Sequence, residues 1–209
     1  MHDENPLLKQ AISLTGEPDA IRDFYADWAD TYDDDLLQAI GYVGPRIAAE
    51  ALVERVSETA LVLDAGCGTG LVGSELKSRN SALTIDGIDL TPAMLEHSRS
   101  RRIYRYLSQA DMMGPLSSID DNVYDGIVSA GVFTNGHVGP KGIDELLRIA
   151  KPGAPIVLTV RDSAWEADGF KAKVEKLEKD GKTRTLAIIH SPYHTKEDVS
   201  CELVVLEVV

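Results

Sequence analysis

Three glycines at alternate positions stand between an apolar run and a stretch with the pattern of a helix. Residues 61–70 read Leu-Val-Leu-Asp-Ala-Gly-Cys-Gly-Thr-Gly, which places Gly66, Gly68 and Gly70 directly after the acid Asp64. Glycine lacks a Cβ atom and tolerates unusual backbone dihedrals, so such a turn can approach a ligand very closely. The turn also directs the first N–H groups of a following helix towards that ligand. These residues predict a ligand-binding turn at the end of a strand.

A second acid ends the next apolar run along the chain. Asp89 follows residues 83–88, and its carboxylate offers two acceptor oxygens, which suits a bidentate hydrogen bond to the hydroxyls of a ribose. The structural alternative is an N-cap, because Asp89 or Thr91 precedes Pro92 at the start of the next helical pattern. Both roles hold together if Thr91 caps the helix and Asp89 faces the ligand. The two turns together predict a nucleoside-type cofactor at the carboxyl ends of parallel strands.

The glycine turn is compatible with two kinds of cofactor. Residues 68–73 formally match the Gly-x-Gly-x-x-Gly fingerprint of dinucleotide-binding proteins, and Asp89 lies about 20 residues on, where the ribose acid belongs. The fingerprint should begin where the strand ends, however, and Gly68 is already the second glycine of the turn. Asp64 would repel a diphosphate, whereas it can orient the loop or accept a hydrogen bond, directly or through water, from an ammonium group. The turn therefore favours an adenosine cofactor with an amino-acid tail, and a turn that only packs a helix on a strand is the structural alternative.

An acid also follows the third expected strand. Asp111 can accept a hydrogen bond from an adenine amino group, with Met112 or Leu90 against the face of the ring. A solvated loop acid is the alternative interpretation of Asp111.

Candidate catalytic and substrate-binding residues lie at the ends of the fourth and fifth expected strands. The fourth run ends at Phe133 and leads to Asn135 and His137, at the place where a substrate would meet the cofactor. His137 is a candidate general base near neutral pH, and the alternative is a histidine that only shapes the loop or the pocket. Arg161 ends the fifth run and can bind a carboxylate or phosphate of the acceptor in a forked geometry, unless it forms only a surface ion pair. We take Phe133, Asn135 and Arg161 as candidate substrate contacts.

These residues require a scaffold in which strands and helices alternate. Strands are expected at 60–65, 83–88, 104–109, 124–130 and 155–161, with helices between them at 70–79, 92–101 and 140–150. This alternation implies a parallel sheet that is covered by helices on both faces. After a surface helix at 165–179, two β-runs at 185–190 and 201–209 indicate an antiparallel pair at the sheet edge.

The chain begins with helical patterns before the first strand. Helices are expected at 6–15, 18–30 and 44–57, and three acids at 33–35 are expected to break the pattern. The second helix carries an aromatic set that includes Tyr25 and Trp28. The helical spacing of this set indicates a face packed into the core.

Composition bounds the class of the protein and its partners. At 209 residues, with 44% hydrophobic and 26% charged residues, the chain is expected to form one α/β domain with short additions. The formal charge of −13 argues against nucleic acid as the main partner, because phosphate binding needs a positive surface. Two cysteines are too few for a disulfide framework, and His190 and His194 lack the neighbours of a metal site, so no metal is expected. No apolar run approaches the roughly 20 residues of a membrane helix, and the N-terminus lacks a signal-peptide pattern, so we expect a cytoplasmic protein without a membrane partner.

Together these motifs resemble the class I S-adenosylmethionine-dependent methyltransferases. The resemblance spans about residues 24–162 and rests on Asp64-Ala-Gly-Cys-Gly-Thr-Gly70, Asp89 with Thr-Pro-Ala-Met-Leu95, Gln109-Ala-Asp111 and Lys151-Pro-Gly153. A closer likeness is to the methyltransferase-like family of the Williams–Beuren syndrome region. That likeness is carried by Tyr32-Asp to Tyr42-x-x-Pro-Arg46, Cys67-Gly-Thr-Gly-Leu-Val72, Ser129-Ala-Gly to Gly136-His-Val138, and Glu145-Leu-Leu-Arg148.

The resemblance implies a fold, a cofactor and a set of contacts. The fold would be a Rossmann-like three-layer sandwich with a seven-stranded, mostly parallel sheet and an antiparallel C-terminal strand. Residues 1–57 would form a helical lid or cap on a Rossmann-like core, residues 58–209, within a single methyltransferase domain. The cofactor would be S-adenosyl-L-methionine, with S-adenosyl-L-homocysteine as product. The residues implied to contact it are Tyr25, Trp28, Tyr32, Asp64, Gly66, Gly68, Asp89, Leu90, Met94, Asp111, Met112 and Ser129.

We therefore expect an S-adenosylmethionine-dependent methyltransferase of class EC 2.1.1.-, which methylates an O, N or S nucleophile of a small molecule. The chain would act as a monomer or a homodimer. Similar families that methylate bases or glutamine carry Asn-Pro-Pro-Tyr or Asp-Pro-Pro-Tyr at the fourth strand, and this chain does not. Three alternatives stay open: a nicotinamide-dependent oxidoreductase, a protein that binds S-adenosylmethionine without catalysis, and a purely structural or partner-binding domain.

Overall fold

The structure is a computed structural model that describes residues 7, 10, 11 and 13–209. The helix expected at 6–15 lies partly outside these residues. None of the described helices is long and apolar enough to cross a membrane.

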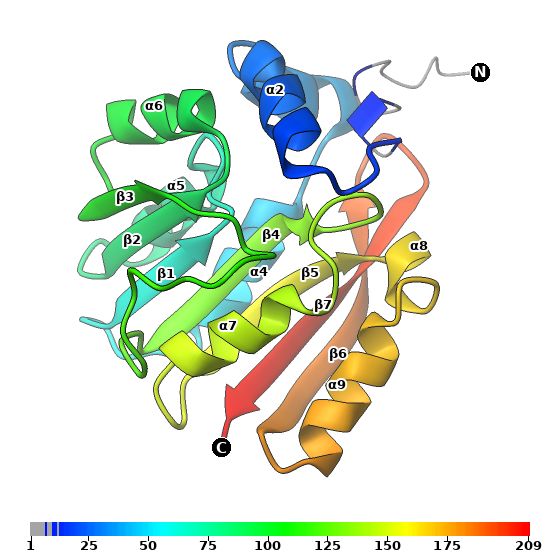
Figure 1. Ribbon diagram of the computed structural model, residues 1–209. Coiled ribbons are helices and arrows are strands. Elements are labelled where there is room, and N and C mark those ends of the chain that lie inside the picture. Colours follow the sequence, from blue (N-terminus) through cyan, green and yellow to red (C-terminus); the bar gives the residue numbers. More distant parts are fainter. Residues whose placement is uncertain (1–6, 8–9, 12) are drawn as a thin grey trace.

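A mixed sheet of seven strands forms the centre of the described residues, in the order β3-β2-β1-β4-β5-β7-β6 (Figure 1). The strands are β1 (Leu61–Ala65), β2 (Thr84–Asp89), β3 (Tyr106–Gln109), β4 (Gly126–Phe133), β5 (Pro155–Arg161), β6 (Thr183–His194) and β7 (Val199–Val208). The first five strands are parallel to one another, whereas β7 runs antiparallel to both β5 and β6. The expected Rossmann-like fold with an antiparallel C-terminal strand is confirmed.

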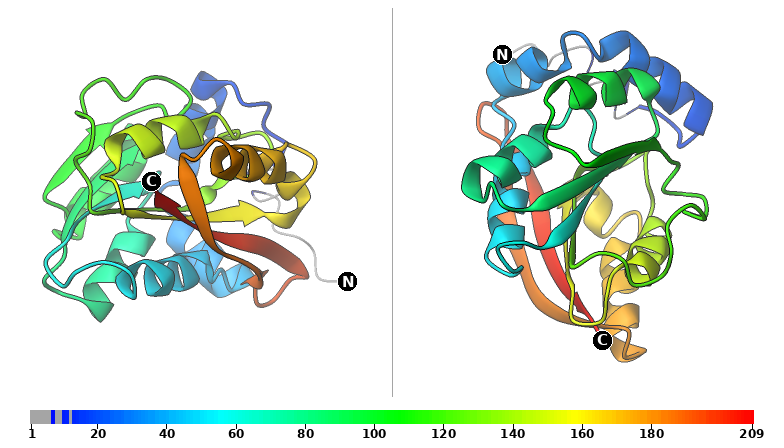
Figure 2. Two further views of the ribbon diagram at one scale, coloured as in Figure 1. Left: turned by 90° about the horizontal axis from the view of Figure 1, so that it is seen from below. Right: turned by 90° about the vertical axis from the view of Figure 1, so that its left-hand side faces the viewer.

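Helices cover both faces of the sheet (Figure 2). They are α4 (Gly44–Val53), α5 (Leu71–Arg79), α6 (Pro92–Ser100), α7 (Gly142–Ile149), α8 (Asp162–Trp165) and α9 (Phe170–Lys179). Alternate residues of each strand belong to opposite faces. Val62 and Val157 therefore pack with α4 and α5, whereas Leu63, Ile156 and Leu158 pack with α7 and α9.

A helical segment lies over the carboxyl ends of the central strands (Figure 1). It consists of α2 (Pro18–Trp28), α3 (Tyr32–Asp34) and a π-helix, η1 (Asp35–Ile40). We call residues 18–40 the cap. Its buried side chains Phe24, Trp28 and Leu36 share a small core with Tyr42 and Tyr193.

The acids at 33–35 do not break the helical pattern, contrary to expectation. Each terminal acid of the run has donors that neutralise it within the fold. Asp33 accepts a hydrogen bond from Thr69 Oγ1 at 2.5 Å and forms an ion pair with Arg101. Asp35 accepts from Trp28 Nε1 at 2.8 Å. These partners lie outside the helix, so local sequence could not reveal them.

Several element boundaries also differ from expectation. The helix expected at 44–57 ends at Val53, and the strand expected at 185–190 runs from Thr183 to His194. The helix expected at 165–179 is divided into α8 and α9, because Gly169 takes a left-handed conformation with φ of 82°. Strand β4 extends to Phe133, past the expected end at residue 130, and its register against β5 shifts between Ser129 and Phe133.

Candidate functional site

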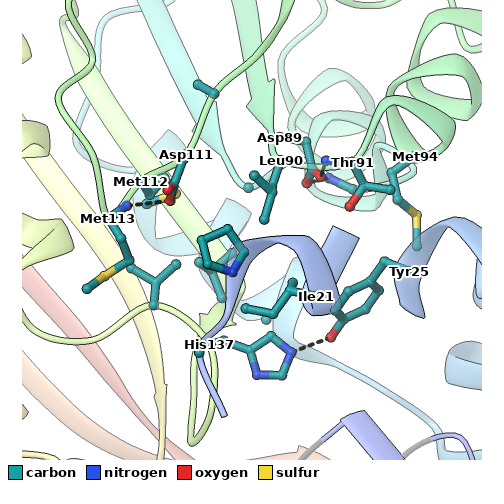
Figure 3. Close-up of a pocket in the computed structure, with 18 of the residues that line it drawn as sticks. Ile21, Tyr25, Asp89, Leu90, Thr91, Met94, Asp111, Met112, Met113 and His137 are labelled. Atoms are coloured by element: carbon teal, nitrogen blue, oxygen red, sulfur yellow. Dashed lines mark hydrogen bonds between the residues drawn. The ribbon is translucent and has the colours of Figure 1, made fainter. Parts of the chain in front are cut away.

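A pocket opens where β1 and β4 separate at their carboxyl ends, beneath the cap (Figure 3). Its empty space is about 780 Å³, including the part open to solvent. This place is the switch point of the sheet, where α/β proteins bind ligands, and the size suits a nucleoside-sized molecule. Ten of the predicted residues line it: Tyr25, Tyr32, Gly66, Gly68, Asp89, Leu90, Met94, Asp111, Met112 and His137.

Asp89 ties the glycine turn to the start of α6. Its Oδ2 accepts a hydrogen bond from the Gly68 N–H, and its Oδ1 accepts one from the Thr91 N–H, both at 2.8 Å. No side chain caps α6, so the N-cap alternative is not what the fold uses. Each carboxylate oxygen retains a second acceptor site, which suits a pair of hydroxyls. Burial raises the pKa of Asp89 from its ordinary value.

The glycine turn presents its backbone to the pocket. Gly68 has a φ of 53°, and a Cβ built there would meet no protein atom within 4 Å. Gly66 has a φ of 74°, and its Cβ would lie 2.2 Å from Val132 Cγ2, so only glycine fits between β1 and β4. The N–H groups of Gly66 and Cys67 donate to Ile88 O, and the Gly68 N–H donates to Asp89.

This environment does not fit a diphosphate. The turn N–H groups from 66 to 68 already have protein acceptors, and no lysine or arginine is among the described residues that line the pocket. The open face of Gly68 beside the Asp89 carboxylate instead fits a nucleoside whose tail carries a positive charge.

Asp64 does not line the pocket. Its side chain is fully buried beneath the turn, where the Tyr104 hydroxyl donates to Oδ2 at 2.7 Å. Oδ1 has no hydrogen bond of ordinary geometry, although the Gly73 amide helps to limit the rise of the pKa. Burial raises the pKa of this carboxyl to about 7. The structure therefore corrects the expectation of a direct ligand contact, since the acid supports the turn from below.

The rest of the first pocket is lined by apolar side chains and by a second acid, Asp111. Leu90 and Met94 lie near Asp89, and Met112 lies beside Asp111 across the pocket (Figure 3). Asp111 Oδ1 accepts from the Met113 N–H at 2.8 Å. The arrangement suits a flat base held between apolar side chains, with the acid at its edge.

A tyrosine–histidine pair joins the cap to the loop after β4. His137 Nδ1 lies 3.0 Å from the Asn135 carbonyl oxygen, which can only accept, so Nδ1 carries the proton. Nε2 is then the acceptor for the Tyr25 hydroxyl, 2.8 Å away (Figure 3). Burial lowers the pKa of His137 and raises that of Tyr25. The pair is therefore neutral at pH 7, with the imidazole ready to accept a proton.

A second pocket, of about 500 Å³ including its open part, adjoins the first. Tyr25, Tyr32, Gly131 and His137 line both. The predicted residues Trp28 and Arg161 line only the second one. Trp28 is also buried in the cap core, so both interpretations of the aromatic set apply to the same helix.

Three predicted site residues face away from both pockets. Ser129 is buried, and its Oγ donates to Ala65 O at 2.7 Å, which links β4 to β1. Phe133 is 1% exposed and packs edge-on against Phe170 in the core. Asn135 bonds Asp168 and Ser163 through its side chain. Ser129 and Phe133 thus lie on the buried side of β4, and Asn135 lies in the loop after that strand.

Several lining residues were not predicted. They include Pro18, Ile21, Thr91, Gly131 and Val138 in the first pocket, and Tyr42, Tyr193 and His194 in the second. A glycine inside a strand pattern is a signal of a bulge, so Gly131 could have been found. The others come from segments that only the tertiary fold brings together.

Comparison with known proteins agrees with this geometry. A protein family described as a methyltransferase domain matches residues 62–153, from β1 to the turn before β5. Human methyltransferase-like protein 27 is 33% identical over 165 residues, which are 76% of this chain and 66% of the relative. A ubiquinone/menaquinone biosynthesis C-methyltransferase from Geobacter sulfurreducens is 29% identical over 69% of this chain and 59% of its own length.

The chain therefore contains a class I S-adenosylmethionine-dependent methyltransferase domain. S-adenosylmethionine is the cofactor that this domain indicates. The alignments cover less than two thirds of the length of the curated relatives.

Solved structures show the fold of the methyltransferase domain at lower sequence identity. A TehB-like S-adenosylmethionine-dependent methyltransferase from Corynebacterium glutamicum has a TM-score of 0.65 and 19% identity, and the match covers 88% of this chain and 98% of that chain. The [4+2]-cyclase SpnF has a TM-score of 0.69 and 15% identity, over 94% of this chain and 98% of that chain. The fold alone does not fix the reaction.

Proposed function

We propose that this protein is a methyltransferase that transfers the methyl group of S-adenosylmethionine to a small-molecule acceptor. The observation that carries the proposal is the first pocket, in which Asp89 and the open face of Gly68 meet without a lysine or arginine among the lining residues. The second pocket, which shares a wall with it, would receive the acceptor.

The residues of the first pocket would divide the cofactor between them. Asp89 would hold the ribose hydroxyls through its free acceptor positions. Asp111 and Met112 would hold the adenine, and the backbone of Gly66 and Gly68 would face the methionine part. When bound, S-adenosylmethionine supplies an activated methyl group, so the protein needs only to align a nucleophile and exclude water.

Tyr25 and His137 would remove a proton from an acceptor that is protonated at working pH. The Tyr25 hydroxyl donates to His137 Nε2, and its oxygen can accept the proton of an acceptor group at the same time. The acceptor would lose one proton to Tyr25, and Tyr25 would pass its own to Nε2. The lowered pKa of His137 keeps that nitrogen free to receive it.

Calorimetric titration tests the choice of cofactor. S-adenosylmethionine and S-adenosylhomocysteine should bind, and NAD should not. Asp89→Asn should weaken binding of both by about 1–3 kcal/mol, because an ionised acceptor is lost. Thermal unfolding of the variant controls for damage to the turn that Asp89 supports. Tight binding of NAD, or full affinity in a folded Asp89→Asn variant, would contradict the proposal.

Because a [4+2]-cyclase shares the fold, the fold leaves open a second candidate, a domain that binds S-adenosylmethionine without transferring its methyl group. Incubation with labelled S-adenosylmethionine and a small-molecule extract separates the two. Label in the extract supports transfer, and binding without label supports the second candidate. We also propose that residues 1–57 act as a cap on a single domain and that the chain is akin to the Williams–Beuren region family.

A further inference from the structure

We propose that the second pocket binds acceptors that carry one carboxylate on an apolar or aromatic body, and that Arg161 holds the carboxylate. This inference rests on the proposed function, because it assigns the second pocket to the acceptor. It names the class of acceptor, which the family match leaves open.

Arg161 is a half-buried cation without a partner. It ends β5 and lines the second pocket, and its guanidinium has no hydrogen bond or ion pair with any other residue that the structure describes. The neighbouring acid Asp162 turns back to accept from the Ser163 N–H. By contrast, Arg105 and Arg148 each form forked contacts with carboxylates of the fold. Arg161 thus presents an unused guanidinium to the pocket, and that group fits a carboxylate in two parallel hydrogen bonds.

Thr134 gives a second, independent indication of a polar ligand group. It lines the same pocket, and its Oγ1 is shielded from solvent without a hydrogen-bond partner among the described residues. A buried hydroxyl normally has a partner, and one that lacks it needs an explanation. In this position the hydroxyl is out of reach of the pocket space, and a rotation about χ1 of Thr134 would bring it to a ligand oxygen there.

Aromatic rings form much of the remaining wall. Tyr42 and Tyr193 meet edge to face, with ring centroids 5.0 Å apart, and Trp28 lies on the cap side. The Tyr193 hydroxyl lies 3.2 Å from both the Tyr42 hydroxyl and Thr159 Oγ1. These hydroxyls therefore satisfy one another and leave ring surface for an apolar body.

The charge of the pocket fits a single negative charge. His137 and His194 line it, and burial lowers the pKa of both, so they are neutral at pH 7. Burial raises the pKa of each tyrosine in the wall. Glu197, which accepts from His194 Nδ1, does not line the pocket. Arg161 is then the one formal charge among the lining residues that the structure describes, so a dianion would leave an uncompensated charge in a half-buried site.

The two pockets meet at Gly131, which lines both. A molecule anchored at Arg161 can therefore extend its other end towards the first pocket, past the tyrosine–histidine pair. The carboxylate would fix the acceptor, and a different group of the molecule would receive the methyl.

Matched carboxylates and amides test this inference on the protein saturated with S-adenosylhomocysteine. The probes are benzoate, phenylacetate, indole-3-acetate and octanoate, each paired with its primary amide, and phenyl phosphate serves as the dianion. Affinities are measured by calorimetry or ligand-detected NMR. At least one carboxylate should bind roughly 10- to 100-fold more tightly than its amide, the ratio expected for hydrogen bonds to a charged group.

Variants assign that preference to residues. Arg161→Gln should abolish the difference between carboxylate and amide, whereas Arg184→Gln, at an exposed arginine of β6, should keep it. Thr134→Val should weaken carboxylate binding while the fold stays intact. The affinity for S-adenosylhomocysteine should be the same in Arg161→Gln as in the natural protein.

Each failure has its own meaning. If no carboxylate binds better than its amide, or if phenyl phosphate binds best, the inference is overturned. If Arg161→Gln loses affinity for S-adenosylhomocysteine, the guanidinium serves the cofactor and the inference is also overturned. If the natural protein fails to bind S-adenosylhomocysteine, the proposed function fails instead, and the same titrations on the free protein still decide whether Arg161 binds carboxylates.

Discussion

At the scale of single residues, the polar side chains near the site serve the fold and the ligand with different atoms. Each carboxylate oxygen of Asp89 accepts one hydrogen bond from a backbone N–H group. A second acceptor position on each oxygen remains for the ligand. His137 uses Nδ1 on its own loop and Nε2 on the cap. Asp64 serves the fold alone, since its carboxylate is buried beneath the turn. Substitution of Asp64 should therefore change the stability of the fold, and substitutions around Asp89 and His137 should also change ligand binding or proton transfer.

Asp64→Asn should make the protein more resistant to unfolding at alkaline pH. The folded-state pKa of about 7 lies above the ordinary value, so the stability from Asp64 is complete below about pH 4 and is lost as the pH rises through about 7. Asparagine has no such dependence and still accepts from Tyr104. At pH 8 the variant should gain up to about 4 kcal/mol over the natural protein, and much less at pH 5. Denaturant unfolding at both values checks this.

The exposed acid Asp198 provides the control for that measurement. Asp198→Asn removes a carboxylate from the surface and controls for the loss of one negative charge. An Asp64→Asn variant whose gain is equal at pH 5 and pH 8 would show that the carboxylate is not strained by burial.

Tyr25→Phe should raise the pKa of His137. The tyrosine hydroxyl donates to the neutral imidazole, which stabilises the unprotonated form, and phenylalanine keeps the ring without the donor. NMR titration of the His137 ring resonances measures the pKa. Tyr106→Phe, at a tyrosine that is 67% exposed on β3, is the control. An unchanged pKa in Tyr25→Phe would show that the two side chains are not hydrogen-bonded in solution.

At the scale of elements, the end of β4 decides where the two pockets meet. The register against β5 shifts between Ser129 and Phe133, and Gly131 within this bulge has a φ of 82°. The Gly131 N–H donates to Thr159 Oγ1 at 3.2 Å, which connects the bulge to the tyrosines of the second pocket. A bulge commonly re-aims side chains next to a functional site.

Gly131→Ala should destabilise the fold more than Gly153→Ala. Both glycines are left-handed, with φ of 82° and 81°, so each substitution carries a backbone cost of roughly 1–2 kcal/mol. Only at Gly131 would the new Cβ meet a neighbour, the Tyr42 hydroxyl at 2.8 Å, whereas at Gly153 it meets nothing within 4 Å. The shift of Tyr42 should add about 1 kcal/mol for the weakened contact with Tyr193. Chemical denaturation of the two variants measures the difference, and equal losses would contradict this account of the bulge.

At the scale of the whole molecule, the cap is attached to the core through the site itself. Asp33 joins it to Thr69 and Arg101 beside the glycine turn, and Tyr25 joins it to His137. Two arginines near α6 form ion pairs within the fold, Arg101 with Asp33 of the cap and Arg105 with Asp86 of β2. A ligand between cap and sheet should therefore strengthen contacts on both sides of the pocket.

S-adenosylhomocysteine should slow amide hydrogen exchange in residues 18–40 and 66–70. Strand β6 lies at the far edge of the sheet, and its residues 183–190 should exchange at the same rate with and without the product. Mass spectrometry of the exchanged protein measures each segment. Protection spread evenly over the chain, or protection that spares residues 18–40, would show that the cap does not close on the ligand.

Local chemistry determined the parts of this protein that the sequence could predict. An apolar run that stops at an acid and then turns through Gly66 and Gly68 specifies a strand, a tight turn and a helix whatever surrounds them. The same is true of the run that ends at Asp89. The alternation of strands and helices then implied the parallel sheet and its switch point, and hence the place of the first pocket.

Tertiary structure decided which side of each strand end faces the ligand. Successive residues of a strand point in opposite directions, so a one-residue change of register exchanges pocket and core. In β4 this alternation places Ser129 and Phe133 on the buried side, although their place in the sequence had suggested the site. Tyr42 and Tyr193 are 151 residues apart and meet only because β6 returns along the sheet edge. The sequence by itself determined the cofactor pocket, because its signals are local, and only the packing of distant segments decided the pocket for the acceptor.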